Sequence, residues 1–355
     1  MTDMRLKLKE GPTKYDLVSL GEVMLRFDPG DTRIRHARQF QVWEGGGEYN
    51  VARGLHSCFG KSTGIVTSLV DNEIGKLIKG LIKSGGTDTS LINWFPDDGI
   101  GKTARNGVYY LEKGFGIRSA LGTSDRGHTA ISKMTPQDID WEDLFGNQGV
   151  RWFHTGGIFA GLSDSTPDVV VHAAEIARKH GTTVSYDLNY RPSLWKERGG
   201  KAESDKVNSK ILRHIDVLFG VSNLDTDPTD LEHSVFERAI EKLAKEYPNL
   251  KAIASTMRIV KTANVNDWSG VLWSNGEFYR GMKFNNLEIY DRVGGGDAFA
   301  AGIIHGILQD CPGEDTINTG IAHGALTMGT PGDNSLVEQN EVYQLVQNQD
   351  ASVLR

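Results

Sequence analysis

The sequence is poor in cysteine, has no long apolar run and carries no excess of positive charge. Its 355 residues include two cysteines, Cys58 and Cys311, which are far apart and match no metal motif, so a reducing, cytoplasmic compartment fits best. No stretch of about 18 apolar residues is present, so we expect no membrane partner. The first residues, MTDMRLKLKEGPTKYD, alternate in charge and lack an apolar centre, which argues against a secretory signal.

The charge balance limits the classes of partner. The net charge is −7, and no basic stripe or tail is present, so nucleic acid is not an expected partner. A small anionic ligand remains compatible, because a few local donors can hold an anion against the overall field. Glycine is abundant, with 42 scattered residues, which indicates many tight turns between short elements.

Strand-like and helix-like segments alternate along most of the chain. Apolar runs such as GIVTSLV and TTVSYDL are separated by segments with helical spacing. One of these, PDVVVHAAEIARKHG, ends at Gly181, and SVFERAIEKLAKEYPNL opens with a capping-box pair, Ser234 and Glu237, before Pro248. This order predicts an α/β fold whose mostly parallel sheet is covered by helices on both faces. Ligands of such sheets bind outside the carboxyl ends of the strands.

Two segments do not fit this alternation. Residues 24–45 and 101–129 are rich in glycine, arginine and tyrosine and have no helical spacing between strand-like pieces. We interpret them as a small projecting sheet, a discontinuous lid on one α/β domain of residues 15–350. Two long surface loops would fit the pattern about equally well. No internal repeat or linker divides the chain.

The stretch DRVGGGDAFAAGIIHGIL combines three glycines, an acid and an apolar run with helical spacing, so a helix should begin near Gly296. The first turn of a helix presents unpaired N–H groups and a partial positive charge, and glycines let an anion approach them. Asp297 would stay ionised beside this cradle and could accept a proton from a hydroxyl. A plain helix cap behind a glycine turn is the alternative on this segment alone.

Two other segments place polar groups where a ligand could bind. In VSYDLNYRPSLW, Asp187, Asn189 and Arg191 alternate, so they share one face if the strand continues through them. In EGGGEYNVARGL, three glycines precede Glu48, Asn50 and the apparent start of a helix. A solvent-facing strand end and a glycine-rich turn with an Asn cap are the respective alternatives.

Standard nucleotide motifs are absent. GLHSCFGKS misses the P-loop spacing, because five residues rather than four separate Gly54 from Gly60. No strand–GxGxxG–helix pattern appears, which weakens the hypothesis of a nicotinamide-dependent oxidoreductase.

Several motifs in order resemble the ribokinase-like (PfkB-type) carbohydrate kinases. DRVGGGDAFAAG is similar to the family's D-T-x-G-A-G-D-x-F-x-x-G signature, and GGGEYNVARGL followed by VDNEIG is similar to its N-terminal signature. GEVMLRF, YYLEKGF, SDRGHTAIS, DLNYRPSLW and NVNDW resemble the 2-keto-3-deoxygluconate kinase branch. The match runs from about residue 15 to about 340. It implies the ribokinase-like fold and disfavours the cap-only interpretation of Asp297.

The resemblance implies a phosphoryl-transfer site with ATP and Mg²⁺ as cofactors. Asp297 matches the catalytic base, and the amides of Gly294, Gly295 and Gly296 match the anion hole. Asp291 belongs to a loop that binds a monovalent cation in some members, although Arg292 stands where Thr is usual.

The resemblance also implies the remaining site residues. The predicted sugar-side residues are Gly45, Gly46, Asn50, Tyr109, Arg126, Asn189 and Arg191. The predicted nucleotide-side residues are Thr256 and Gly294, together with His323 and Gly329 of the segment AHGALTMGTPGDNS, residues 322–335. Arginine suits the carboxylate of a sugar acid, which it can bind through two hydrogen bonds. Ser124 replaces a Tyr of the branch, which leaves the exact acid open.

A larger departure lies in LFGVSNLDTD. The branch usually reads G-N-E-E-D there, and in the family this segment helps to place the magnesium ion. Val221 and Ser222 follow Gly220, and Asp225, or alternatively Asn223 or Asp227, could substitute for the usual acid.

The function we expect is ATP-dependent phosphorylation of a sugar acid, 2-keto-3-deoxygluconate to its 6-phosphate. The alternatives are a catalytically weak kinase-like binding protein and a kinase of a neutral sugar. Family members often pair their lids, so we also expect a homo-oligomer formed through the lid.

Overall fold

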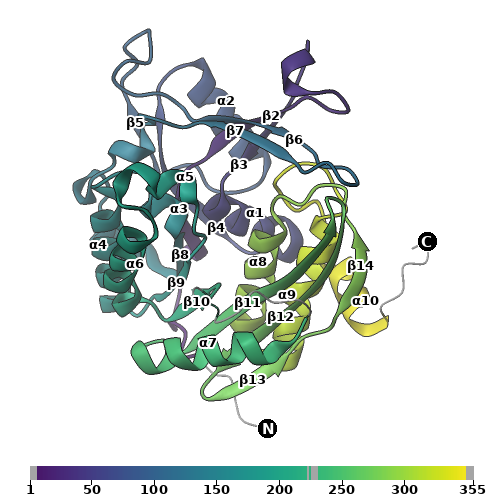
Figure 1. Cartoon of the computed structure of the whole chain (residues 1–355). Coiled ribbons are helices and arrows are strands. Elements are labelled where there is room, and N and C mark those ends of the chain that lie inside the picture. The colour runs from purple at the N-terminus through teal and green to yellow at the C-terminus, as the bar shows by residue number, and fades with distance from the viewer. Residues whose placement is uncertain (1–5, 222–223, 225–230, 349–355) are drawn as a thin grey trace.

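The computed structural model describes residues 6–221, Leu224 and residues 231–348. A large sheet lies between two layers of helices, and a small sheet projects above one end of it (Figure 1). The predicted α/β class, with helices on both faces of the sheet, is therefore confirmed.

Within the described residues, the large sheet has ten strands in the order β13-β12-β11-β10-β9-β8-β1-β4-β5, with β14 paired to β12. The pairs from β5 to β11 are parallel, and the pairs that β12 makes are antiparallel. The strands are β1 (Tyr15–Leu20), β2 (Met24–Asp28), β3 (Gln41–Gly45), β4 (Thr63–Val70), β5 (Ile92–Phe95), β6 (Val108–Glu112), β7 (Leu121–Asp125), β8 (Val150–Gly156), β9 (Thr183–Asp187), β10 (Val217–Phe219), β11 (Ala252–Thr262), β12 (Val265–Ser274), β13 (Glu277–Arg280) and β14 (Phe284–Glu288).

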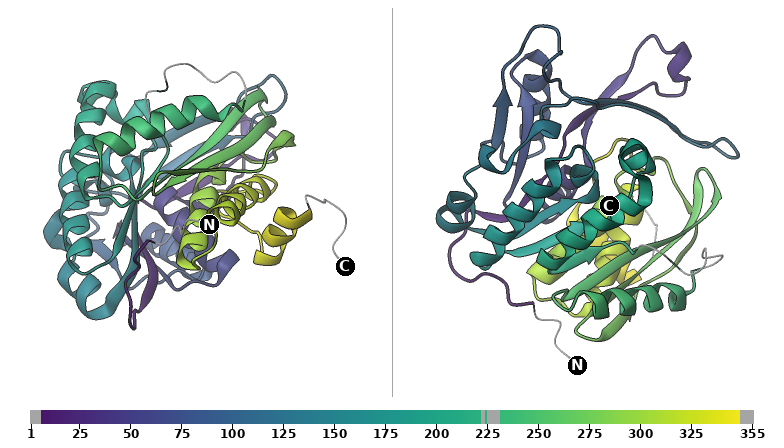
Figure 2. Two further views of the ribbon diagram at one scale, coloured as in Figure 1. Left: turned by 90° about the horizontal axis from the view of Figure 1, so that it is seen from below. Right: turned by 60° about the vertical axis from the view of Figure 1, so that its left-hand side comes forward.

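Helices cover both faces of this sheet, as the left view of Figure 2 shows. Helices α3 to α7 pack on one face and α1, α2 and α8 to α10 on the other. The helices are α1 (Gly47–Phe59), α2 (Glu73–Ser84), α3 (Gly157–Ala160), α4 (Thr166–Lys179), α5 (Pro192–Trp195), α6 (Gly200–Ile211), α7 (His233–Glu246), α8 (Gly295–Leu308), α9 (Gly313–Thr327) and α10 (Gln339–Asn348).

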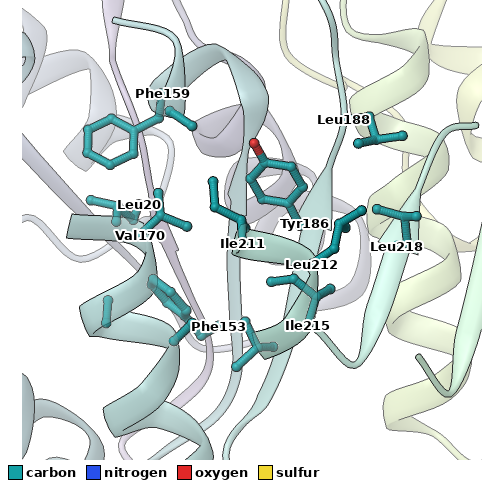
Figure 3. Packing of buried hydrophobic residues seen from close by; sticks show 14 of the residues in the cluster. Leu20, Phe153, Phe159, Val170, Tyr186, Leu188, Ile211, Leu212, Ile215 and Leu218 are labelled. Atoms are coloured by element: carbon teal, nitrogen blue, oxygen red, sulfur yellow. The ribbon is translucent and has the colours of Figure 1, made fainter. Parts of the chain in front are cut away.

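The central strands are apolar throughout because both of their faces are buried. In β8, Trp152 packs into the core beneath α1 and α8, while Phe153 packs into the core beneath α4. Figure 3 shows the second of these cores, in which Phe153 and Tyr186 from the strands lie near Val170 and Ile211 from the helices. Alternating side chains of one strand therefore stabilise opposite layers.

The two irregular segments predicted as a lid form the small sheet, in the order β3-β2-β6-β7. The prediction of a separate small sheet is confirmed, and the alternative of two long surface loops is wrong. The right view of Figure 2 shows this sheet standing apart from the helical layers. Its tip contacts the turn between β11 and β12, where the Ala263 amide donates to the Gly116 carbonyl at 2.8 Å.

Three helix predictions have different outcomes. Helix α8 begins at Gly295, next to the predicted Gly296, and Gly181 follows the end of α4 with φ +75°. The capping box predicted for α7 is wrong, because the Ser234 hydroxyl donates to the Glu232 carboxylate and Glu237 instead binds Arg280.

No helix among the described residues is long and apolar enough to cross a membrane.

Helices α8 and α9 pack unusually closely through bare glycines. A Cβ added at Gly302 in α8 would lie 2.7 Å from the Cα of Gly320 in α9, which is backbone and cannot swing away. Gly80 in α2 is a contrasting case, because a Cβ there meets nothing within 4 Å and the residue is exposed.

We expect Gly302→Ala to lower the free energy of unfolding by about 1–3 kcal/mol, because the added methyl group forces the two helices apart. Gly80→Ala should instead raise it by roughly 0.5–1 kcal/mol, since alanine loses less backbone entropy in a helix. Urea unfolding followed by circular dichroism measures both changes. A Gly302→Ala variant as stable as the wild type would contradict this account of the helix contact.

Candidate active site

A cleft of about 610 Å³ lies between the small sheet and the carboxyl ends of the central strands. Glu22 after β1, Asp187 at the end of β9 and Thr256 in β11 line its floor, and Tyr109 of β6 lines the lid side. The position agrees with the expectation that ligands of a parallel sheet bind at the carboxyl ends of its strands.

Asp297 lies in the first turn of α8 and faces this cleft. The Asn50 side-chain amide donates a hydrogen bond of 2.7 Å to its Oδ2, which joins the two predicted glycine motifs. Burial raises the pKa of Asp297 to about 7, with Asp187 and Asp333 adding to the rise, while Asn50 and Arg191 oppose it. From its place at a helix N-terminus we expected this carboxylate to stay ionised. That expectation is corrected, because burial raises the pKa of Asp297 by more than the positive end of the helix can lower it.

The three glycines before Asp297 have different neighbours. Gly294 has φ +80°, and a Cβ there would collide with the backbone carbonyl of Asp333. A Cβ at Gly295 would lie 2.8 Å from the Met328 side chain, and only at Gly296 would it enter open space. Gly294 and Gly296 line the cleft. Close packing of the chain therefore accounts for the glycines at positions 294 and 295.

The N-terminal glycine motif is packed in the same way. A Cβ at Gly46 would collide with the Glu22 carbonyl, and one at Gly45 would collide with the Asp333 carboxylate. Gly46 and Asn50 line the cleft. Glu48 instead points into the protein, where its carboxylate accepts a hydrogen bond of 3.2 Å from the Phe159 amide. Burial raises the pKa of Glu48 to about 7.

Asp187, Asn189 and Arg191 all line the cleft, although not for the reason that their spacing suggested. Strand β9 ends at Asp187, Asn189 has φ +30°, and Arg191 directly precedes α5, so no shared strand face exists. A turn, which asparagine tolerates in this conformation, brings the three together. Burial raises the pKa of Asp187 to about 6, and Arg191 opposes this rise.

The arginines of the cleft differ in how far they are already paired. Arg126 is ion-paired with buried Glu22, and its Nε lies 2.9 Å from Glu22 Oε2. Arg191, Arg258 and Arg292 also line the cleft, and none of them forms an ion pair within 4 Å in the part of the chain that the structure describes. Burial lowers the pKa of Arg258, and the positive charges of Arg292 and Arg191 lower it further. This wall of the cleft is therefore suited to an anion.

Tyr109 reaches the cleft as predicted, and its hydroxyl donates to the carboxylate of Asp333. Arg26 binds the other oxygen of Asp333 from beneath, at 2.8 Å. The segment that contains Asp333 was expected on the nucleotide side, but this residue lies against the lid. Glu22, Arg26, Arg258 and Asp333 were not among the residues predicted for the site. The sequence offered little to find them by. Glu22, Arg26 and Asp333 lie within segments that resemble the family, and Arg258 lies two residues after the predicted Thr256.

The predicted nucleotide residues are not all brought together. Thr256 and Gly294 line the cleft. His323 is fully buried, accepts or donates a hydrogen bond at 2.8 Å with Ser335, and has its pKa lowered to about 3 by burial. Gly329 borders a separate hollow of about 810 Å³ near the lid tip.

The two predicted metal ligands stay predictions. Asp225 lies outside the described residues, as do Asn223 and Asp227. Asp291 is buried and paired with Arg26. Within residues 6–221 and 231–348, no group of three or more His, Cys, Asp or Glu side chains is arranged to hold a metal ion.

Comparison with known proteins extends over nearly the whole chain. The family model for pfkB family carbohydrate kinases matches residues 14–340. The crystal structure of 2-dehydro-3-deoxygluconokinase from Thermotoga maritima superposes with a TM-score of 0.83 at 32% identity, covering 94% of this chain and 99% of that one.

Two curated relatives align with similar coverage. A 2-dehydro-3-deoxygalactonokinase of Haloferax volcanii is 26% identical over 96% of this chain and 99% of its own length. A 2-dehydro-3-deoxygluconokinase of Bacillus subtilis is 28% identical over 90% of this chain and 91% of its own length. Because the family model and the 32% identical structure both span most of the sequence, the chain belongs to the pfkB family of carbohydrate kinases and has its ribokinase-like fold.

Proposed function

We propose that the protein transfers the terminal phosphoryl group of ATP to a hydroxyl of a sugar acid, converting 2-keto-3-deoxygluconate or a close relative to its 6-phosphate. The observation that carries the proposal is the position of Asp297, which faces the cleft at a helix N-terminus beside Gly294 and Gly296, in a cleft that unpaired arginines also line. Relatives whose names specify gluconate and galactonate acids support the substrate class and leave the stereochemistry to experiment.

The chemistry requires alignment and charge stabilisation more than covalent help. As the hydroxyl oxygen forms a bond to phosphorus and the bond to the ADP oxygen breaks, Asp297 takes the hydroxyl proton. The amides at the start of α8 point their partial positive charge towards the phosphoryl oxygens, and they need no rearrangement during the step. Asn50 holds the Asp297 carboxylate through its 2.7 Å hydrogen bond.

Magnesium would neutralise part of the charge on the ATP phosphates. We assign no described residue to hold it, because the predicted ligand segment lies outside the described part of the chain. Arg258 and Arg292, on the same side of the cleft as Gly294, offer additional positive charge to a phosphate chain.

The carboxylate of the substrate needs a cation that is not already neutralised. Arg126 was predicted for this role together with Arg191, but Arg126 is ion-paired with Glu22 in the ligand-free protein. Arg191 directly precedes α5 and lies close enough to Asp187 and Asp297 to lower their pKa values. We therefore assign the main contact with the acid to Arg191 and a supporting contact to Arg126.

We expect Asp297→Asn to lower turnover by about 10²–10⁴-fold while leaving ATP affinity nearly unchanged, because the amide cannot take the proton. In the wild type, kcat/KM should rise with pH through about 7 and then level off, since only the ionised form of Asp297 acts as the base. A coupled ADP-release assay between pH 5.5 and about 9 measures both effects.

The matched control is Asp315→Asn, which removes an exposed acid from the first turn of the neighbouring helix α9 and should leave turnover unchanged. If Asp297→Asn keeps wild-type turnover, Asp297 is not the base.

We expect turnover on 2-keto acids of the gluconate or galactonate series and little on ribose or fructose. Arg191→Met should raise KM for the acid by about 10- to 150-fold, the loss of one charge-assisted hydrogen bond, with little change in KM for ATP. The control Arg151→Met removes an arginine that pairs with Asp16 at the far end of the sheet. Turnover on a neutral sugar but on no sugar acid would refute the proposed substrate class.

We also propose that the lid mediates self-association. Phe115, Ile117, Leu121 and Val42 are exposed apolar side chains of the lid segments, and the outer edges of β3 and β7 pair with no further strand among the described residues. Such edges and apolar groups favour burial against a second copy.

Light scattering at micromolar concentration should therefore give a mass of at least twice the monomer. Ile117→Glu should reduce that mass, because it places a charge in the contact, whereas Ile100→Glu, which changes an exposed isoleucine outside the lid segments, should not. A monomer mass for the wild type would contradict the proposed assembly.

A further inference from the structure

The family resemblance implies a monovalent cation bound near Asp291. In this chain the side chain of an arginine already contacts Asp291. The guanidinium group of Arg26, on lid strand β2, is fully buried and contacts three carboxylates. Its Nη2 lies 2.5 Å from Asp291 and 2.9 Å from Asp28, and its Nη1 lies 2.8 Å from Asp333.

The carboxylates of this cluster have no oxygen without a donor. In Asp28, one oxygen accepts from Arg26 and the other from the Gly30 amide at 2.8 Å. In Asp291, the second oxygen accepts from the Val293 amide at 3.3 Å.

Asp333 completes the same pattern. Its Oδ1 accepts from Arg26 and its Oδ2 accepts from the Tyr109 hydroxyl. The neighbouring carbonyl of Met328 accepts from the amides of Tyr290 and Asp291 at 2.9 and 3.1 Å. The buried guanidinium of Arg26 already neutralises part of the charge of these three acids, and a second cation beside them would be repelled by it in a site that water does not screen. The residues present therefore do not fit a monovalent ion.

We propose that Arg26 is a built-in cation that replaces a bound monovalent ion in this kinase, so that turnover needs neither K⁺ nor Na⁺. The proposal rests on the kinase function proposed above. A fixed guanidinium carries the same single positive charge as the ion, and it holds its three partners in fixed directions without depending on salt concentration.

Arg26 is a positioning residue, because it acts on the cleft through its partners. Asp291 begins the loop that leads to Gly294, and the backbone carbonyl of Asp333 packs directly against Gly294. Through Tyr109 and Asp333 the same arginine joins the lid to that loop. A change at Arg26 should therefore disturb the alignment of the anion-binding amides, although the arginine itself touches no substrate.

The electrostatic balance explains why the arginine keeps its charge. Burial alone would lower the pKa of Arg26, but the negative charges of Asp333 and Asp291 raise it above its ordinary value. Burial also raises the pKa of Asp333, which Arg26 opposes. Removing the arginine would leave three buried acids without their shared countercharge, which is strongly destabilising.

The direct test compares wild-type turnover of a sugar acid in choline chloride, NaCl and KCl at equal ionic strength, with ATP supplied as its choline or Tris salt. We expect rates within about twofold of one another. Saturable activation of tenfold or more by K⁺ or Na⁺ would overturn the proposal. No turnover in any of the salts would instead count against the proposed kinase function.

A second measurement does not depend on activity. Crystals soaked in rubidium or thallium(I) salts should show no anomalous peak beside Asp291, and the melting temperature should be the same in choline chloride and KCl. A thallium or rubidium ion bound by Asp291 would overturn the proposal even if the protein had no kinase activity.

The variant Arg26→Met tests the positioning role. We expect it to lose turnover at least tenfold and to recover part of it when guanidinium ion is added at millimolar concentration, an effect that a purely structural role would not produce. Arg33→Met is the matched control, because Arg33 comes from the same lid segment but is itself partly exposed, and it pairs with Glu112, which does not line the cleft. An Arg26→Met enzyme with full turnover in choline chloride would contradict the role. If the variant does not fold, the two wild-type measurements still decide.

Discussion

The buried ion cluster around Arg26 is the contact on which the arrangement of the cleft depends. One guanidinium ties the lid strand β2 to the loop before α8, through Asp291, and to the segment after α9, through Asp333. These three pieces are far apart in sequence, and each contributes to the walls or the backing of the cleft. The Nε atom of Arg26 is buried without a hydrogen-bond partner. Its two Nη atoms bind all three carboxylates, each of which has a second donor, so the cluster can hold the lid in a fixed relation to Gly294.

The cleft combines close packing with costly burial of acids. Gly45 and Gly294 have no room for a side chain, because Asp333 occupies that space, so the N-terminal glycine motif and the glycine run before Asp297 meet at a single residue. The packing around Asp297 and Asp187 leaves both only partly exposed, and this loss of solvation raises their pKa values. A carboxyl group whose pKa is near 7 is well matched to general-base chemistry at neutral pH, which supports the role proposed for Asp297.

The sequence by itself determined the fold class and most of the residues that line the cleft. Apolar runs buried on both sides predicted the parallel sheet, and the glycine run before Asp297 predicted the start of α8 to within one residue. Asn50 and Arg191, which line the cleft, lie beside local signals, a glycine turn and a strand end, whereas Tyr109 was named from the family motifs alone. Local chemistry of this kind is readable from neighbours in the chain.

Only the tertiary structure decided which of these groups are paired and what charge they carry. Nothing near Arg26 in sequence indicates that its partners include Asp291 and Asp333, and nothing near Arg126 indicates that Glu22 neutralises it. Burial likewise depends on the whole fold, which is why the ionisation of Asp297 was misjudged from the helix terminus alone. Ion pairing and desolvation act between residues that are distant along the chain, so they appear only when the sheet and the lid are assembled.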